Sequence, residues 1–304
     1  MAAVSTATVA LGLPARVRRT VDLLERRGYA LPPSRLAQAC LGGPVPSSAV
    51  LGSLAEAELG LHHGLVVSAG CRERASAISD RQRDHPLVAA AYLGESISFS
   101  RSLAGLCPFV ISISIAGSLA SGGFRESDDV DLNLVVEDGY RHLAYVALNA
   151  LGLLHALRHR GKPVDAHTAR PLAPRLMTAN LVLERSACFP LARQDEDMAY
   201  ELFSSQPVVG AAFLSSVIQA NPRLAEHFPQ LARTEQATEA EVRARLPRWL
   251  YPRWLDRPAR AVGLAAWRYM QWTRRHSPEA LARVAFVRST MRPYTLFDNR
   301  GLLE

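Results

Sequence analysis

The chain has 304 residues, of which 48% are hydrophobic and 21% are charged. This composition is typical of a soluble protein with one or two folded domains and excludes large-scale disorder. The four cysteines show no CxxC spacing, so nothing indicates a cysteine zinc site or redox pair, and a reducing, cytoplasmic setting is expected. The longest apolar stretch, residues 143–157, is shorter than the roughly 20 residues that a bilayer requires. Residues 1–14 lack the leading positive charges of a secretory signal, so neither a membrane partner nor export is expected.

The formal net charge is +7, which in general favours nucleic acid or another polyanion as a partner. Lys162 is the only lysine, however, and the other formally positive side chains are arginines. Together with the abundant alanine, leucine and proline, this pattern indicates the codon usage of a GC-rich genome. A solvated basic surface is therefore the favoured interpretation, and nucleic acid as the main substrate is not favoured.

Residues 1–70 predict a module of three short helices and a hairpin. The helices are expected at 17–27, 33–40 and 49–58, and the hairpin at 59–68. This order is the outline of a winged helix, which either docks on DNA or RNA or serves as a packing or dimerisation module. The third helix is acidic and has no arginine to meet phosphates, so the second role is at least as well supported as the first.

Residues 71–190 predict a core in which strands and helices alternate. The expected elements are a long or broken helix at 71–105, strands at 109–116 and 130–136, an apolar helix at 141–160, and extended segments at 163–168 and 177–184.

Residues 191–304 predict a helical region that is broken at a series of prolines. All four tryptophans lie there: Trp249, Trp254, Trp267 and Trp272. Aromatic residues at helical spacing usually belong to a core, so these are expected to be mainly buried, with base stacking as the alternative for one of them. No internal repeat is evident.

The residues that carry chemistry lie between the first two predicted strands of the core. The first strand enters a Gly117-Ser118 turn, and the second begins with Asp129-Val130-Asp131. Carboxylates two residues apart on a strand share one face, where they repel each other unless a cation lies between them. Mg²⁺ suits such oxygen ligands and leaves positions for phosphate oxygens, while a glycine lets the backbone approach a phosphate and a serine hydroxyl can donate to it.

This pattern resembles the nucleotidyltransferase superfamily typified by DNA polymerase β. The signature is a hydrophobic residue, Gly, then Ser or Gly, a spacer of about a dozen residues, and Asp-hydrophobic-Asp-hydrophobic. Here Ala116-Gly117-Ser118 is followed by residues 119–128 and by Asp129-Val130-Asp131-Leu132. The departures are a small residue at Ala116 and a third acid, Asp128, in the run. The resemblance implies a nucleotidyltransferase core with a mixed sheet flanked by helices, preceded by the winged-helix-like module and followed by the helical region.

The resemblance also implies residue roles. Asp129 and Asp131 would be catalytic and would hold two Mg²⁺ ions, or Mn²⁺ in their place. The third carboxylate would be Asp165, with Glu184 as the alternative, and catalysis becomes doubtful if neither serves. Gly117, Ser118, Arg125 and Lys162 would contact a nucleoside triphosphate such as ATP, although surface positions are equally expected for Arg125 and Lys162.

The expected function is transfer of a nucleoside monophosphate from a triphosphate to a small molecule or a protein, with release of pyrophosphate. One alternative is nucleotide addition to RNA, which would be favoured if the arginines of the helical region formed a basic groove with the N-terminal module. The other alternative is a nucleotide-binding or regulatory protein with the same fold and no catalysis.

Overall fold

A computed structural model describes residues 11–165, 167–169, 171–174, 176–233 and 242–297. Residues 1–10, on which the expectation of no secretory signal partly rests, and residue 166 in the expected segment 163–168 lie outside this part. The chain divides into two compact units, each built from three separate stretches. Unit 1 comprises Met1–Leu87, Gln194–Phe203 and Ile218–Glu235; unit 2 comprises Val88–Arg193, Ser204–Val217 and Gln236–Glu304. The first two divisions, after Leu87 and after Arg193, lie beyond the domain boundaries expected near residues 70 and 190.

The N-terminal part of unit 1 contains the predicted three helices and hairpin. Its elements are α1 (Leu13–Arg26), α2 (Pro33–Gln38), α3 (Ser47–Ser53), β1 (Leu59–His62) and β2 (Leu65–Ser68). In α1, Val17, Val21 and Leu24 are buried along one face at helical spacing. Gly28 then adopts a left-handed conformation, which ends the helix at low steric cost. The third helix is shorter than expected.

Unit 1 also contains segments from the C-terminal half of the chain. These are most of α7 (Glu196–Ser204), the end of α8 (Ala211–Ala220), α9 (Pro222–His227) and η4 (Pro229–Arg233). Arg27, at the end of α1, pairs with Asp197 at 2.7 Å, and its guanidinium lies 5.1 Å from the ring centroid of Tyr200. The rings of Phe203 and Phe228 stack with centroids 5.1 Å apart. These contacts join α7 to the end of α1 and to the residue that follows α9.

Unit 2 is built around a four-stranded mixed sheet with the order β5-β4-β3-β6. The strands are β3 (Val110–Ala116), β4 (Val130–Val136), β5 (Met177–Glu184) and β6 (Gln206–Val209). β4 runs parallel to β5 and antiparallel to β3, and β3 runs antiparallel to β6. The two predicted strands are confirmed as β3 and β4, and the extended segment expected at 177–184 forms β5. The extended segment expected at 163–168 forms no strand over its described residues, and β6 was not predicted.

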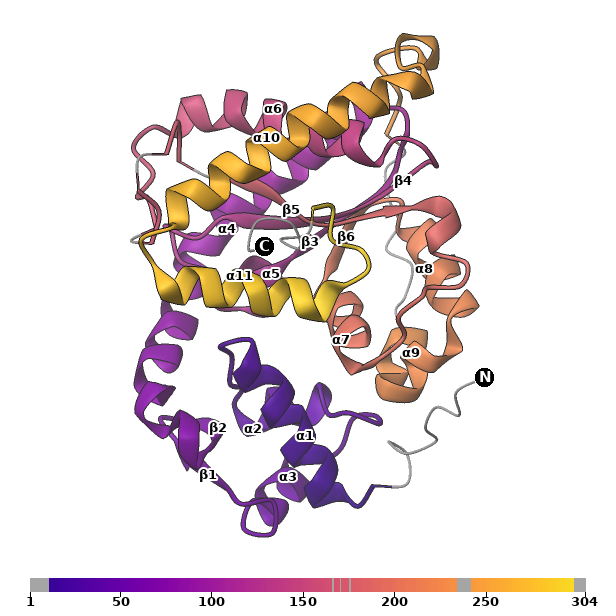
Figure 1. Cartoon of the computed structure of the whole chain (residues 1–304). Coiled ribbons are helices and arrows are strands. Elements are labelled where there is room, and N and C mark those ends of the chain that lie inside the picture. Colours follow the sequence, from indigo (N-terminus) through magenta and orange to yellow (C-terminus); the bar gives the residue numbers. More distant parts are fainter. Residues whose placement is uncertain (1–10, 166, 170, 175, 234–241, 298–304) are drawn as a thin grey trace, which may run out of the picture. The chain divides into compact units, whose positions relative to one another are not determined.

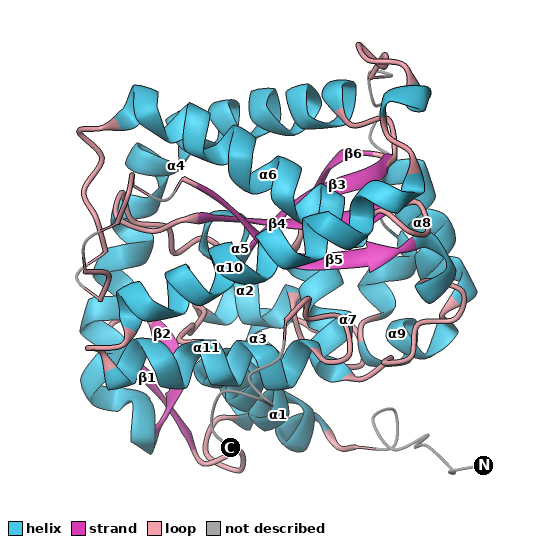
Figure 2. Ribbon diagram, turned by 45° about the horizontal axis from the view of Figure 1, so that its top comes forward, coloured by secondary structure: helices cyan, strands magenta, loops and turns pink. Residues whose placement is uncertain are grey.

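Helices cover this sheet within unit 2. The connector helix is confirmed as one long helix, α4 (Ala75–Leu106), preceded by a 3-10 turn, η1 (Ala69–Arg74), and its residues from Val88 onward belong to this unit. α6 (Arg141–Ala156) packs against β5, and α10 (Asp256–Arg274) packs along α6, as Figures 1 and 2 show. The remaining elements are η2 (Leu157–His159), η3 (Arg185–Ala187), η5 (Arg248–Leu250), η6 (Arg253–Leu255) and α11 (Pro278–Met291). Over the described residues, no helix has both the length and the apolar character needed to cross a membrane.

The expectation of a mainly buried tryptophan set is wrong. Trp267 on α10 is 6% exposed, but Trp249, Trp254 and Trp272 are 76%, 65% and 44% exposed. Two of the exposed rings lie on η5 and η6, short turns that are too brief to bury a helical face. The expectation of no internal repeat is also corrected here, because residues 247–250 and 252–255 both read Pro-Arg-Trp-Leu.

Candidate functional site

The turn after β3 brings the backbone directly against an acid of β4. Ala116 pairs with Asp131 in the antiparallel register, and the chain then turns into the short helix α5 (Gly117–Ser121). Gly117 has φ +62°, and a Cβ at this position would overlap Oδ2 of Asp131 and lie 3.0 Å from its Cγ. Only glycine fits both the left-handed backbone and the close approach. The Gly-Ser signature therefore holds the carboxylate of Asp131 against the main chain.

The other oxygen of Asp131 is held from the neighbouring strand. Thr178 lies opposite Asp131 in the parallel register of β4 and β5, and its hydroxyl donates to Oδ1 of Asp131 at 3.0 Å. Two residues further along each strand, the side-chain amide of Asn180 donates to Oδ1 of Asn133 at 3.0 Å. Neutral side chains thus occupy β5 beside the acid-bearing end of β4.

Asp128, the additional acid in the motif, organises the loop between α5 and β4. Its Oδ2 accepts hydrogen bonds from the Ser118 hydroxyl and from the Arg125 backbone N–H, both at 3.1 Å. Ser118 is 6% exposed, whereas the side chain of Arg125 is exposed. The structure therefore gives Ser118 a hydrogen bond inside the loop and leaves the Arg125 guanidinium at the surface.

Lys162 brings a positive charge to this acidic loop. The side chain is 7% exposed, and its Nζ donates to the carbonyl oxygen of Asp128 at 2.7 Å. Burial lowers the pKa of Lys162, and the carboxylates around it offset only part of that effect. These carboxylates are Asp129, Asp128, Glu126 and Asp165. The only lysine of the chain thus offsets part of the electrostatic repulsion between the neighbouring carboxylates.

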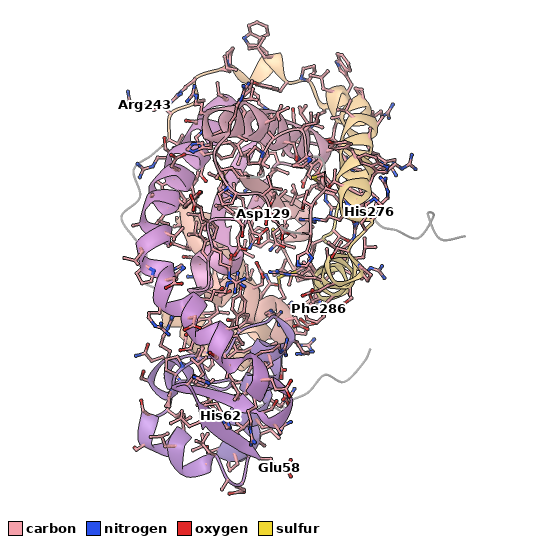
Figure 3. All side chains as sticks on the ribbon, turned by 90° about the vertical axis from the view of Figure 1, so that its left-hand side faces the viewer. Glu58, His62, Asp129, Arg243, His276 and Phe286 are labelled. Atoms are coloured by element: carbon pink, nitrogen blue, oxygen red, sulfur yellow. The ribbon has the colours of Figure 1, made fainter. Side chains whose placement is uncertain are left out.

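Asp129 faces a second cation from the C-terminal region. Its Oδ2 lies 3.9 Å from Nη2 of Arg274, the last residue of α10. The side chains of Asp129 and Arg274 are 29% and 19% exposed, so neither is fully enclosed. Asp129, labelled in Figure 3, immediately precedes β4. At 3.9 Å between partly exposed groups, this ion pair contributes little to stability.

The third carboxylate does not join the first two in this structure. Asp165 lies in a loop outside any strand, where its Oδ1 accepts from the backbone N–H of His167 at 3.2 Å. Glu184 pairs with Val136, at the opposite end of β5 from Thr178, and accepts from the backbone N–H of Gly139 at 2.7 Å. Six residues of strand separate Thr178 from Glu184, which is about 20 Å. Glu184 is therefore out of reach of Asp131.

A different set of potential metal ligands converges elsewhere in unit 2. Among the described residues, the one group of three with ligand atoms within 4.8 Å of each other is Glu95, His155 and His159. The acids Asp129, Asp131 and Asp165 do not meet that distance. No histidine was expected to bind a metal ion. The spacing of His155 and His159, four residues apart at the end of an apolar helix, was the signal that could have found this group.

The comparisons with known proteins add no assignment. No family model, no curated protein and no solved structure matches this chain. The case for function therefore rests on the geometry of the site itself.

Proposed function

We propose that this chain is a nucleotidyltransferase that binds a nucleoside triphosphate with Mg²⁺ beside the Gly117 turn. The observation that carries the proposal is the packing of Gly117 against Asp131, because it places a main-chain turn and an acidic strand end within one contact. A phosphate chain needs backbone donors, and its metal ion needs carboxylates. This edge of the sheet brings those two requirements together.

The proposed reaction is in-line displacement at the α-phosphate of the triphosphate. A hydroxyl of a small-molecule or protein acceptor loses its proton to solvent and forms a new bond to the α-phosphorus, the bond from that phosphorus to the bridging β-phosphate oxygen breaks, and pyrophosphate leaves. Asp129 and Asp131 would bind the ion, which offsets charge in the transition state. Lys162, whose amino group already lies among the acids, would move toward the triphosphate oxygens once Mg²⁺ takes its place. Asp165 would complete the acids through a rearrangement of its loop.

A second candidate is a nucleotide-binding protein without turnover. The residue opposite Asp131 on β5 is Thr178, which is neutral. An acid at this position would reach an ion bound to Asp131, so its absence favours binding without catalysis. Without a third carboxylate, the ion that would activate the acceptor lacks one of its protein ligands. Nucleotide addition to RNA is less well supported, because Arg248 of the expected basic groove forms an ion pair with Glu137 and stacks over the Tyr140 ring at 4.5 Å.

The test is a binding titration followed by a transfer assay on the full chain. Calorimetry with each of the four ribonucleoside triphosphates, with and without Mg²⁺, measures binding. Incubation with the same triphosphates labelled at the α-phosphate measures transfer to protein and to pooled small molecules. We expect Mg²⁺-dependent binding and pyrophosphate release, both abolished by Asp131→Asn.

Glu184→Gln is the matched control, because it neutralises an acid on the adjacent strand at the far end of the sheet. It should leave binding and transfer unchanged. Binding without transfer, lost in Asp131→Asn, would establish the second candidate instead. Absence of any binding at about 1 mM triphosphate would reject both, since that corresponds to an interaction weaker than about 4 kcal/mol.

A further inference from the structure

At the end of α6, two imidazole nitrogens contact the same carboxylate oxygen. Oε2 of Glu95 lies 2.7 Å from Nε2 of His155 and 2.9 Å from Nε2 of His159. The two imidazole rings have centroids 5.0 Å apart. All three side chains are partly exposed, at 36%, 19% and 29% for Glu95, His155 and His159. The potential ligand atoms of the three side chains therefore lie close together and can be reached by an ion from solvent.

The backbone explains why these three side chains meet. His155 occupies the last turn of α6, and His159 ends the 3-10 turn η2 that continues it, so the four-residue spacing keeps both rings on one side. Glu95 reaches them from α4, inside the same unit. The ring of Phe99, one turn further along α4, lies 5.7 Å from the His155 ring and restricts its movement. The geometry is set by two helices of the packed core.

We propose that Glu95, His155 and His159 bind a divalent transition-metal ion of the Zn²⁺ type. Two imidazole nitrogens and one carboxylate oxygen are a ligand set that Zn²⁺ takes in open, three-ligand sites. The described residues supply no fourth ligand within 4.8 Å, so the remaining position is left for water or for another molecule. Nitrogen ligands distinguish this site from the oxygen-only acids near Gly117, which suit Mg²⁺.

The observed separations need only a small adjustment to admit the ion. Ligands about 2.1 Å from a tetrahedral Zn²⁺ are about 3.4 Å from each other. The present separations of 2.7 and 2.9 Å are those of hydrogen bonds. Side-chain rotations that move the ligand atoms apart by roughly half an ångström make room for the ion. The partial exposure of Glu95 leaves space for this movement.

The cysteines do not compete for the ion at neutral pH. All four are buried, and burial raises the pKa of Cys107 and of Cys188 to about 12, which keeps both thiols protonated. Burial also raises the pKa of Cys40 and of Cys71. A thiol must lose its proton to bind Zn²⁺ well. Zinc uptake by the folded protein therefore reports on the histidines.

The experiment is titration of tag-free, chelator-treated full-length protein with ZnCl₂ and with CoCl₂. We expect one Zn²⁺ per chain with a Kd below about 10 µM, and visible Co²⁺ absorption typical of tetrahedral coordination. His159→Gln and Glu95→Gln should each weaken binding by about 100-fold or more, because two ligands hold the ion poorly. His276→Gln is the control, since His276 is an exposed histidine of the same unit, labelled in Figure 3.

Two further measurements make the outcome decisive. Tryptophan fluorescence verifies that each variant is folded, and at least one of the two ligand variants must pass this check. If both variants fail it, stoichiometric zinc binding and a tetrahedral Co²⁺ spectrum in the wild type still support the proposal. Asp131→Asn should retain full zinc affinity, so failure here and failure of the proposed nucleotidyltransfer are separate results. Wild-type binding weaker than about 10 µM, or equal binding by folded His159→Gln and wild type, would overturn the proposal.

Discussion

Gly117 is the residue on which the candidate site depends most directly. We expect Gly117→Ala to abolish Mg²⁺-dependent triphosphate binding and to lower stability, because the new Cβ would displace the Asp131 carboxylate. The left-handed backbone alone costs about 1–2 kcal/mol for a residue with a Cβ. Gly28→Ala is the matched control, since Gly28 has φ +78° with no neighbour within 4 Å of an added Cβ. Equal loss of thermal stability in both variants would show that the contact with Asp131 contributes nothing.

Lys162 supplies a second residue-level prediction. Lys162→Met should destabilise the protein by about 1 kcal/mol at low Mg²⁺, because the partly exposed carboxylates around it lose a cation and the Asp128 carbonyl loses a donor. Millimolar MgCl₂ should restore part of that loss, whereas NaCl at equal ionic strength should not. Urea unfolding followed by tryptophan fluorescence measures both effects, since all four tryptophans lie in unit 2. Identical responses to the two salts would argue against an Mg²⁺ site at these acids.

At the scale of elements, α6 receives its cap from another helix. Tyr140 precedes α6 and gives no side-chain cap, but Asp256 of α10 accepts from the backbone N–H groups of His142 and Leu143 at 2.7 and 2.8 Å. Its second oxygen contacts Nδ1 of His142 at 2.8 Å. An acid at a helix N-terminus also interacts favourably with the helix dipole. Asp256 therefore fixes the start of α6 and joins it to α10.

This cap predicts a pH-dependent stability. Burial acts to raise the pKa of Asp256, but the bonds from His142 and Leu143 outweigh it and leave the pKa below its ordinary value. A depressed carboxyl pKa stabilises the fold above the unfolded value of about 3.9, and the benefit disappears as the pH falls through the lower folded value. Asp256→Asn should cost about 1–2 kcal/mol at pH 7 and progressively less below pH 4. Urea unfolding at pH 7 and at pH 3.5 tests this, and an undiminished cost at pH 3.5 would contradict it.

The absence of an acid on β5 beside Asp131 can be tested by restoring one. Thr178→Asp should tighten Mg²⁺ binding about tenfold or more, because it adds a charged oxygen ligand opposite Asp131. Thr178→Val removes only the hydroxyl that donates to Asp131 and serves as the control. Calorimetric titration with MgCl₂ compares the two. An unchanged affinity in Thr178→Asp would mean that the ion does not lie between β4 and β5.

The sequence predicted the elements around the site well because their patterns are local. The alternation of Ile111, Ile113 and Ile115 and the run after Asp129 indicated β3 and β4, and the last residue of β3, Ala116, pairs with Asp131 near the start of β4. β6 was missed because it has four residues, includes Pro207, and is stabilised mainly by pairing with β3. Its existence depends on a partner strand that is distant in the chain.

The site was predicted less completely than the fold, and for a similar reason. Spacing within β4 could identify Asp129 and Asp131, but it could not show that Thr178 lies opposite Asp131, because that depends on a parallel register between separate strands. Likewise, Glu95 is 60 residues from His155, and only the packing of α4 in the core brings them together. The prediction that the tryptophans are mainly buried was wrong because the exposure of a side chain depends on which distant segments pack against it.

At the scale of the whole molecule, neither unit is a continuous piece of chain. Unit 1 needs α7 and residues near Phe228 from the C-terminal half, and the pair between Arg27 and Asp197 is one of the contacts that hold them. A fragment comprising residues 88–304 would therefore carry α7 and Phe228 without their partners. Simple truncation does not isolate a folded domain.

We expect that fragment to expose apolar surface. It should bind the dye ANS and be less soluble than the full chain, because the buried rings of Tyr200 and Phe228 lose the N-terminal part of unit 1, which contacts this region through Arg27 and through the bond from Gly42 N–H to the His227 carbonyl. Its tryptophan emission should stay close to that of the full chain, which separates local exposure from general unfolding. A fully soluble fragment without dye binding would contradict the interleaved arrangement.

The burial of the only lysine gives the protein a single, shielded side-chain amine. Reagents that acylate lysine have one side-chain target, and we expect them to react with it slowly, because its amine is buried and bonded to the Asp128 carbonyl. The extent of acylation at Lys162, measured by peptide mass spectrometry, therefore reports how often local opening exposes this amine.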